Sequence, residues 1–154
     1  MKRLITILTI LVLITGCNEP EATENLTADT PGFVLSDGKV EVKIGEDGAL
    51  LSLVNKGTGH NYASGEGLWR MFYNTHEEKE MQIDGTENTP AVSQEGDMIT
   101  ITYKDLVHRG KALKMDLTLT VKVEDGAVRF GSVVSNNEPG TIIRELQYPL
   151  VGNM

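Results

Sequence analysis

The chain has 154 residues, a formal net charge of −8 at neutral pH, 40% hydrophobic residues and 23% charged residues. This composition is that of an ordinary globular domain, and it excludes a disordered chain and a multi-span membrane protein. The length allows one buried core but no complete (β/α)8 barrel, which takes ~250 residues. The excess of acidic groups would repel a phosphate backbone, so nucleic acid is not expected as a partner.

The amino terminus is typical of an export signal. Lys2 and Arg3 precede an apolar run that is interrupted only by threonines and is too short to span a bilayer as a helix. Ile-Thr-Gly-Cys follows at 14–17 and resembles the bacterial lipobox, which implies a cleaved lipoprotein signal peptide over residues 1–16 and a lipid on Cys17. Cys17 is the only cysteine, and the alternatives for it are a free thiol or an intermolecular disulfide. Loss of Lys2 and Arg3 with the leader would move the net charge from −8 to −10.

Residues 17–32 are predicted to be a disordered acidic tether. Positions 18–31 contain four acidic residues, two prolines and three threonines but a single large aliphatic side chain, which cannot bury enough surface to order the segment. An acidic stretch after a lipidated cysteine also resembles the surface-export signals of some Bacteroidota lipoproteins, although short acidic linkers are common. We therefore expect a protein of the bacterial cell envelope, anchored to the outer membrane or cell surface by its acyl chains.

From about residue 33 the hydrophobic pattern has a period of two, which indicates half-buried strands. Residues 39–44 and 49–54 flank the turn Gly-Glu-Asp-Gly and predict a β-hairpin. Residues 55–61 are expected to form a loop. Further strands are predicted over 67–73, 91–94, 98–104, 113–123, 127–135 and 141–148.

The segment 113–123 alternates over its whole length and would span ~36 Å as a strand, which suits a large sandwich better than a small barrel. No helix is predicted after the leader. Strands at regular spacing with turn residues between them predict an all-β fold, an antiparallel β-sandwich over residues 33–154.

Three segments then resemble a known family: the hairpin at 48–60, Leu-Trp-Arg-Met at 68–71, and the late strand at 142–150 that contains Tyr-Pro. Together they resemble the N-terminal, galactose-mutarotase-like β-sandwich that precedes the catalytic barrel in a group of bacterial glycoside-hydrolase-like proteins. The likeness covers about residues 33–152 and implies a supersandwich fold. It also implies a downstream catalytic domain as partner, with the family's catalytic carboxylates lying outside this chain.

The residues themselves offer little chemistry for catalysis. Glycoside hydrolysis usually needs two carboxyl groups ~5 to 9.5 Å apart, and the densest acidic cluster, at 76–80, is expected to be a solvated charge run. His60, His76 and His108 have no metal-ligand spacing. We therefore predict no catalytic residue, no metal and no cofactor, with Ca²⁺ at a Gly-containing turn as an alternative. The aspartates in such turns are Asp47, Asp84, Asp97 and Asp125.

Residues 67–73 form the most aromatic segment and offer a candidate carbohydrate site. In a strand, Trp69 and Tyr73 share one face and Arg70 lies on the other, so an aromatic platform for a sugar ring is predicted, with Arg70 binding hydroxyl groups. His60 and Tyr62, in the preceding loop, would form its rim. The alternative is that these rings pack between the sheets, since the chain has only one Trp, four Tyr and three Phe to fill its core.

Two functions are left open at this point. The chain is either the non-catalytic N-terminal part of a carbohydrate-active, glycoside-hydrolase-like protein, or a free-standing surface lipoprotein that binds an oligosaccharide or a protein through its loops. Hydrolysis by this chain alone would need paired carboxyl groups that the sequence does not indicate.

Overall fold

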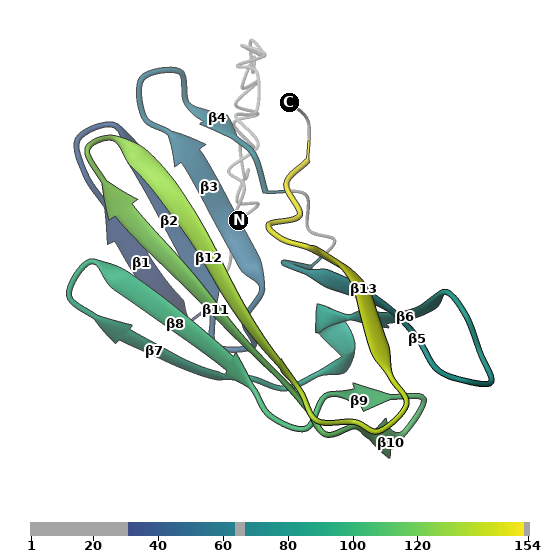
Figure 1. Cartoon of the computed structure of the whole chain (residues 1–154). Helices are drawn as coiled ribbons and strands as arrows, with labels where there is room; N and C mark the ends of the chain where they lie inside the picture. Colours follow the sequence, from purple (N-terminus) through teal and green to yellow (C-terminus); the bar gives the residue numbers. More distant parts are fainter. Residues whose placement is uncertain (1–30, 64–66, 153–154) are drawn as a thin grey trace, which may run out of the picture.

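The computed structural model describes residues 31–63 and 67–152, and over these ranges the protein is all-β (Figure 1). Every strand pairing is antiparallel, and a single 3₁₀ turn, η1 (Gly85–Glu87), is the one helical element described. No helix in these ranges is long and apolar enough to cross a membrane. The signal peptide, Cys17 and residues 18–30 lie outside the described residues.

The first sheet consists of four strands that are neighbours in sequence: β1 (Gly32–Ser36), β2 (Val40–Gly45), β3 (Leu50–Asn55) and β4 (His60–Asn61), in that order. The predicted hairpin of β2 and β3 is confirmed, and Gly48 adopts φ +79° in its turn. β1 coincides with the start of the period-two pattern at about residue 33 and includes Gly32, which was expected to belong to the tether. β4 lies in the segment that was expected to be a loop.

The second sheet has the order β12-β11-β8-β7. Its strands are β7 (Ala91–Glu95), β8 (Met98–Tyr103), β11 (Met115–Glu124) and β12 (Ala127–Asn136). In β11 every second side chain is buried over ten residues, as the alternation predicted. This sheet packs face to face with the first one, through β8, β11 and β12 on one side and β1 and β2 on the other. Most of the buried core residues belong to these two sheets.

A third sheet stands beside these two and has the order β13-β5-β6 (Figure 1). It consists of β5 (Arg70–Asn74), β6 (Met81–Asp84) and β13 (Ile142–Gln147). A short hairpin of β9 (Val107–His108) and β10 (Lys111–Ala112) lies near its end. Neither β6 nor this hairpin was predicted from the sequence.

Tyr148, which follows β13, connects the third sheet to the second. Its hydroxyl group donates to the Thr120 main-chain carbonyl at 2.8 Å, and its ring meets Phe130 edge-on with 5.6 Å between ring centroids. Burial raises the pKa of Tyr148, so the hydroxyl group stays protonated and keeps donating. One continuous core therefore supports all three sheets.

Candidate functional site

Trp69 and Tyr73 are core residues, which corrects the expectation of an exposed aromatic platform. Each is 1% exposed. Trp69 meets the Tyr103 ring edge-on at 5.1 Å, and Gly85 lies so close that a Cβ there would stand 2.7 Å from the indole Nε1. A ring enclosed in this way has no face for a sugar, so the packing alternative describes both side chains. Leu68 is buried as well, because it precedes β5 and is not part of its alternation.

The other predicted site residues are separated from one another. Arg70 lies on the opposite face of β5 from Tyr73, on the side away from the core. His60 and Tyr62 contact each other at the β4 edge of the first sheet, with 4.4 Å between ring centroids. Neither lines any of the hollows described below. The five residues therefore do not form one site. Of these five, only Arg70 belongs to the candidate binding surface described next.

Arg70 belongs to a polar ladder on the outer face of the third sheet. Its Nε donates to Asp84 Oδ1 on β6 at 2.7 Å, and Gln82 Nε2 donates to Asp84 Oδ2 at 2.8 Å. On β13, which flanks β5 on the edge opposite β6, Gln147 Nε2 donates to Glu145 Oε1 at 2.9 Å. The strand register places these groups in two rows, Gln147-Arg70-Asp84 and Glu145-Phe72-Gln82. We call this surface the outer face.

Phe72 lies at the centre of the outer face, half-buried, with polar side chains on both flanking strands. The register of β13 shifts between Ile143 and Glu145, and this bulge leaves Arg144 exposed beside the ring. The resulting hollow has a volume of about 510 Å³. It is lined by Phe72, Asn74, Lys79, Glu80, Arg144, Glu145 and Gln147.

The charges of the ladder and of the residues that line the hollow balance. Three side chains are cationic (Arg70, Lys79, Arg144) and three are carboxylates (Glu80, Asp84, Glu145). Burial by itself would raise the pKa of Asp84, but the hydrogen bonds from Arg70 and Gln82 outweigh it and hold that pKa below its usual value. Asp84 is therefore ionised at neutral pH and keeps Arg70 in one position.

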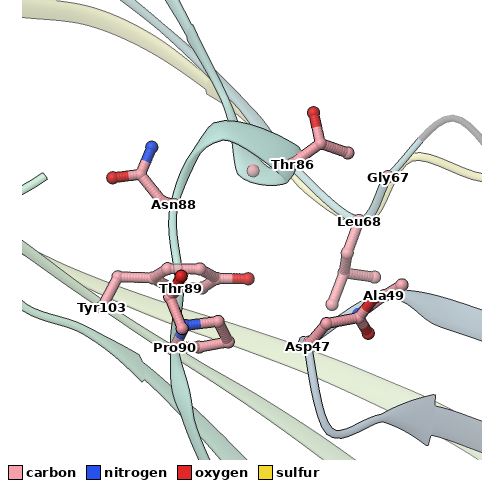
Figure 2. A pocket seen from close by; sticks show the side chains of 11 residues that line it. Asp47, Ala49, Gly67, Leu68, Thr86, Asn88, Thr89, Pro90 and Tyr103 are labelled. Carbon is pink, nitrogen blue, oxygen red and sulfur yellow. The ribbon is translucent and has the colours of Figure 1, made fainter. Parts of the chain in front are cut away.

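A smaller hollow of about 190 Å³ lies between the β2–β3 turn and η1 (Figure 2). Its polar side chains already serve the main chain: Asp47 Oδ1 accepts from the Ala49 amide at 3.0 Å, and Asn88 Oδ1 accepts from the Val107 amide at 2.7 Å. Tyr103 closes it on one side. We interpret this hollow as a product of turn packing.

Within residues 31–63 and 67–152, no group of three or more His, Cys, Asp or Glu side chains is placed to hold a metal ion. Two of the four aspartates considered for Ca²⁺ have cationic partners: Asp84 binds Arg70, and Asp97 forms an ion pair with Lys122 at 3.4 Å. In the acidic cluster at 76–80, Glu78 pairs with Arg109 at 3.4 Å. This exposed ion pair gives one of the three glutamates in the cluster a structural partner.

No family model, curated protein or solved structure matches the chain. The resemblance to a galactose-mutarotase-like domain thus stays a prediction.

Sequence reasoning missed most of this face. Phe72 lies one residue before Tyr73 and so falls on the side of the strand opposite the expected platform, and the partners Gln82 and Asp84 come from an unpredicted strand. A signal was present in Met-Gln-Ile-Asp at 81–84, where apolar and polar residues alternate and the polar pair matches the polar face of β5. Four residues are too few for such a pattern to stand out.

Proposed function

We propose that this protein is a lipid-anchored, extracytoplasmic β-sandwich that binds a neutral oligosaccharide on its outer face without hydrolysing it. The observation that carries the proposal is the position of Phe72, an aromatic ring on the non-core face of a sheet, between rows of hydrogen-bonding side chains. The lipid anchor and the location in the bacterial envelope come from the sequence. The face-to-face packing of two four-stranded sheets supports a supersandwich as the fold type.

A sugar ring has an apolar C–H face and an edge of hydroxyl groups, and the outer face offers a complement to both. Phe72 supplies a flat apolar surface, while Gln147, Glu145 and Arg70 supply acceptors and donors around it. Because Arg70 is already held by Asp84, little side-chain entropy would be lost when a ligand binds. The balance of charge favours an uncharged ligand over an acidic or a basic one.

The electrostatics of the outer face favour binding over hydrolysis. A glycosidase needs a carboxylic acid whose pKa is raised, so that it can protonate the leaving group. The pKa of Asp84 is shifted in the opposite direction by its hydrogen bonds to Arg70 and Gln82. This carboxylate is thus suited to fixing a cation in place.

The test is the substitution Phe72→Ala, measured by calorimetry against a neutral oligosaccharide selected on a glycan array. We expect a Kd in the micromolar to millimolar range and about a tenfold loss of affinity in the variant, since stacking on one ring contributes about 1.4 kcal/mol. Phe33→Ala is the matched control, because Phe33 is also half-buried but lies in β1. Equal affinities of the wild type and Phe72→Ala would refute the proposal.

A second proposal is that the chain is the non-catalytic part of a larger carbohydrate-active protein, and β12 favours it. This ten-residue strand ends the second sheet. Its core-facing side chains Val128, Phe130 and Val134 are only half-buried, and Val133 on its other face is 69% exposed. Incompletely covered apolar surface of this kind is typical of a face on which another domain packs.

The intact mass of the native lipoprotein distinguishes the two forms. The native protein is to be captured from its source cells with an antibody against residues 33–154. A mass near that of the 138 residues from Cys17 to Met154 plus acyl chains would refute the proposal that the chain is part of a larger protein. A mass several times greater would support it.

A further inference from the structure

β12 is a long strand at the edge of the second sheet. Among the described strands it pairs with β11 alone, so half of its main-chain N–H and C=O groups point away from the sheet (Figure 1). The strand runs for ten residues without a proline. Its one charged side chain, Arg129, is paired with Glu124 at 3.0 Å. An unprotected edge of this length is a template on which another strand pairs.

The other edges of the three large sheets are short or interrupted. The edge strands β1 and β7 have five residues each, β6 has four, and β4 has two. β13 has six residues, but its register shifts between Ile143 and Glu145. Short edges and bulges prevent strands of other chains from adding to a sheet. β12 has neither device, so we expect strand addition at its edge.

Both sides of β12 are open to solvent near its middle. Ser132 pairs with the buried Leu119 and therefore lies on the core-facing side, yet it is exposed. Phe130 and Val134, on the same side, are half-buried. Val133, on the other side, is 69% exposed. A strand added beside β12 would cover apolar surface on both sides of the sheet, which stabilises the pairing.

The sequence of β12 is complementary to itself about Ser132. When two copies of a strand pair antiparallel, a twofold axis normal to the sheet places one residue opposite its own copy. With Ser132 at the axis, Phe130 lies opposite Val134 of the second copy, an aromatic–β-branched pair of the kind that stabilises sheets. The exposed Val133 lies opposite Gly131, which leaves room for its side chain.

The neighbouring registers match less well. With the axis one residue earlier, Phe130 would lie opposite Ser132, and with the axis one residue later it would lie opposite Asn136. Either register sets the aromatic ring against a polar side chain. The register about Ser132 also places Arg129 opposite Ser135, so the charged side chain does not meet its own copy.

We propose that β12 is a dimerisation edge, on which β12 of a second copy of this chain pairs antiparallel about Ser132. The two second sheets then form one continuous sheet of eight strands, four from each copy. Because both copies use the same edge, the interface closes on itself and leaves no free β12 for a third copy. This pairing is independent of glycan binding. A further domain that packs on β12 would occupy the same edge and exclude the second copy.

Cysteine cross-linking of the purified full chain tests the register. Ser132→Cys places a thiol opposite its own copy, where Cα atoms are about 4.5 to 5.5 Å apart, a separation that a disulfide spans. Ser135→Cys is the matched control, because Ser135 is also exposed but its own copy lies six positions along the pair, about 20 Å away. With copper(II) and dioxygen as oxidant, we expect a covalent dimer of Ser132→Cys on a non-reducing gel. Ser135→Cys and the wild type, which share Cys17, should remain uncross-linked.

Sedimentation over a dilution series tests the affinity. We expect the wild type to reach twice the mass of one chain. Val133→Lys places two lysines diagonally across the pair, each near Arg129 of the other copy, and this like-charge repulsion should weaken dimerisation about tenfold. Ile142→Lys is the control, because Ile142 is similarly exposed, at 66%, but lies in β13. It should dimerise as the wild type does.

Three outcomes would overturn the proposal. A wild type that stays monomeric at every concentration would refute dimerisation. Equal cross-linking of Ser132→Cys and Ser135→Cys would refute pairing about Ser132. Dimerisation of Val133→Lys as tight as that of the wild type would place the interface elsewhere. Circular dichroism shows whether each variant is folded, and if Val133→Lys is not, the two cysteine variants decide.

Discussion

Replacing Trp69 by alanine should damage the fold rather than ligand binding alone. The indole is 1% exposed, and a buried tryptophan removes about 200 Å² from water, which at ~25 cal/mol/Å² corresponds to about 5 kcal/mol. Measured truncations of buried aromatic residues cost about 3 to 5 kcal/mol, so we expect the free energy of unfolding to fall by about 4 kcal/mol. A typical domain has a total of about 5 to 15 kcal/mol, so this loss leaves little stability.

The measurement is urea unfolding of the purified protein, followed by circular dichroism because Trp69 is the only tryptophan and its fluorescence is lost with the substitution. Phe72→Ala is the internal comparison, since its half-buried ring lies on the outer face of the same region; we expect it to cost about 1 kcal/mol. If Trp69→Ala lowers the unfolding midpoint no more than Phe72→Ala does, the assignment of Trp69 to the core is refuted.

Three further outcomes are expected. Gly85→Ala would place a Cβ 2.7 Å from the Trp69 Nε1 and should cost about 1 to 3 kcal/mol in urea unfolding, a loss that should shrink in a Trp69→Phe background. His108→Leu should raise thermal stability by about 1 kcal/mol, because it removes two unsatisfied buried nitrogens; a lower melting temperature would contradict this. The lowered pKa of Asp84 means that its ion pair with Arg70 stabilises the fold above about pH 4 and that this contribution disappears as the pH falls through the folded-state pKa. Asp84→Asn should therefore cost about 1 kcal/mol at neutral pH, an amount reduced by the partial exposure of the pair, and almost nothing in acid, in urea titrations over a pH series.

The long strands were predictable because the alternation of apolar and polar residues in them continues over many positions. Ten alternating residues in β11 admit one interpretation, and the structure confirms it. In β5 the period was also correct, but the sequence could not say which side of the strand faces the core. An aromatic residue suits both a core and a sugar platform, so the choice between Trp69 and Phe72 depends on what covers each face.

The outer face itself was beyond sequence reasoning because its groups come from distant strands. Arg70 was identified as a candidate, but its partner Asp84 was interpreted as a turn residue, since β6 has only four residues. Glu145 and Gln147 reach the site through β13, and no local pattern indicates that this strand pairs with β5. His108 was seen as a scattered histidine, because its burial follows from the packing of a two-residue strand.

The pairing of β13 with β5 also sets the order in which the protein can become functional. In the first sheet every strand pairs with its neighbour in sequence, so these hairpins need only short loop closures. Ile142 and Asn74, by contrast, pair across 68 positions, and non-local pairings of this kind form slowly. The first sheet would therefore form before the outer face does. Under the proposed function, the chain could bind a glycan only after its last strand has docked on β5.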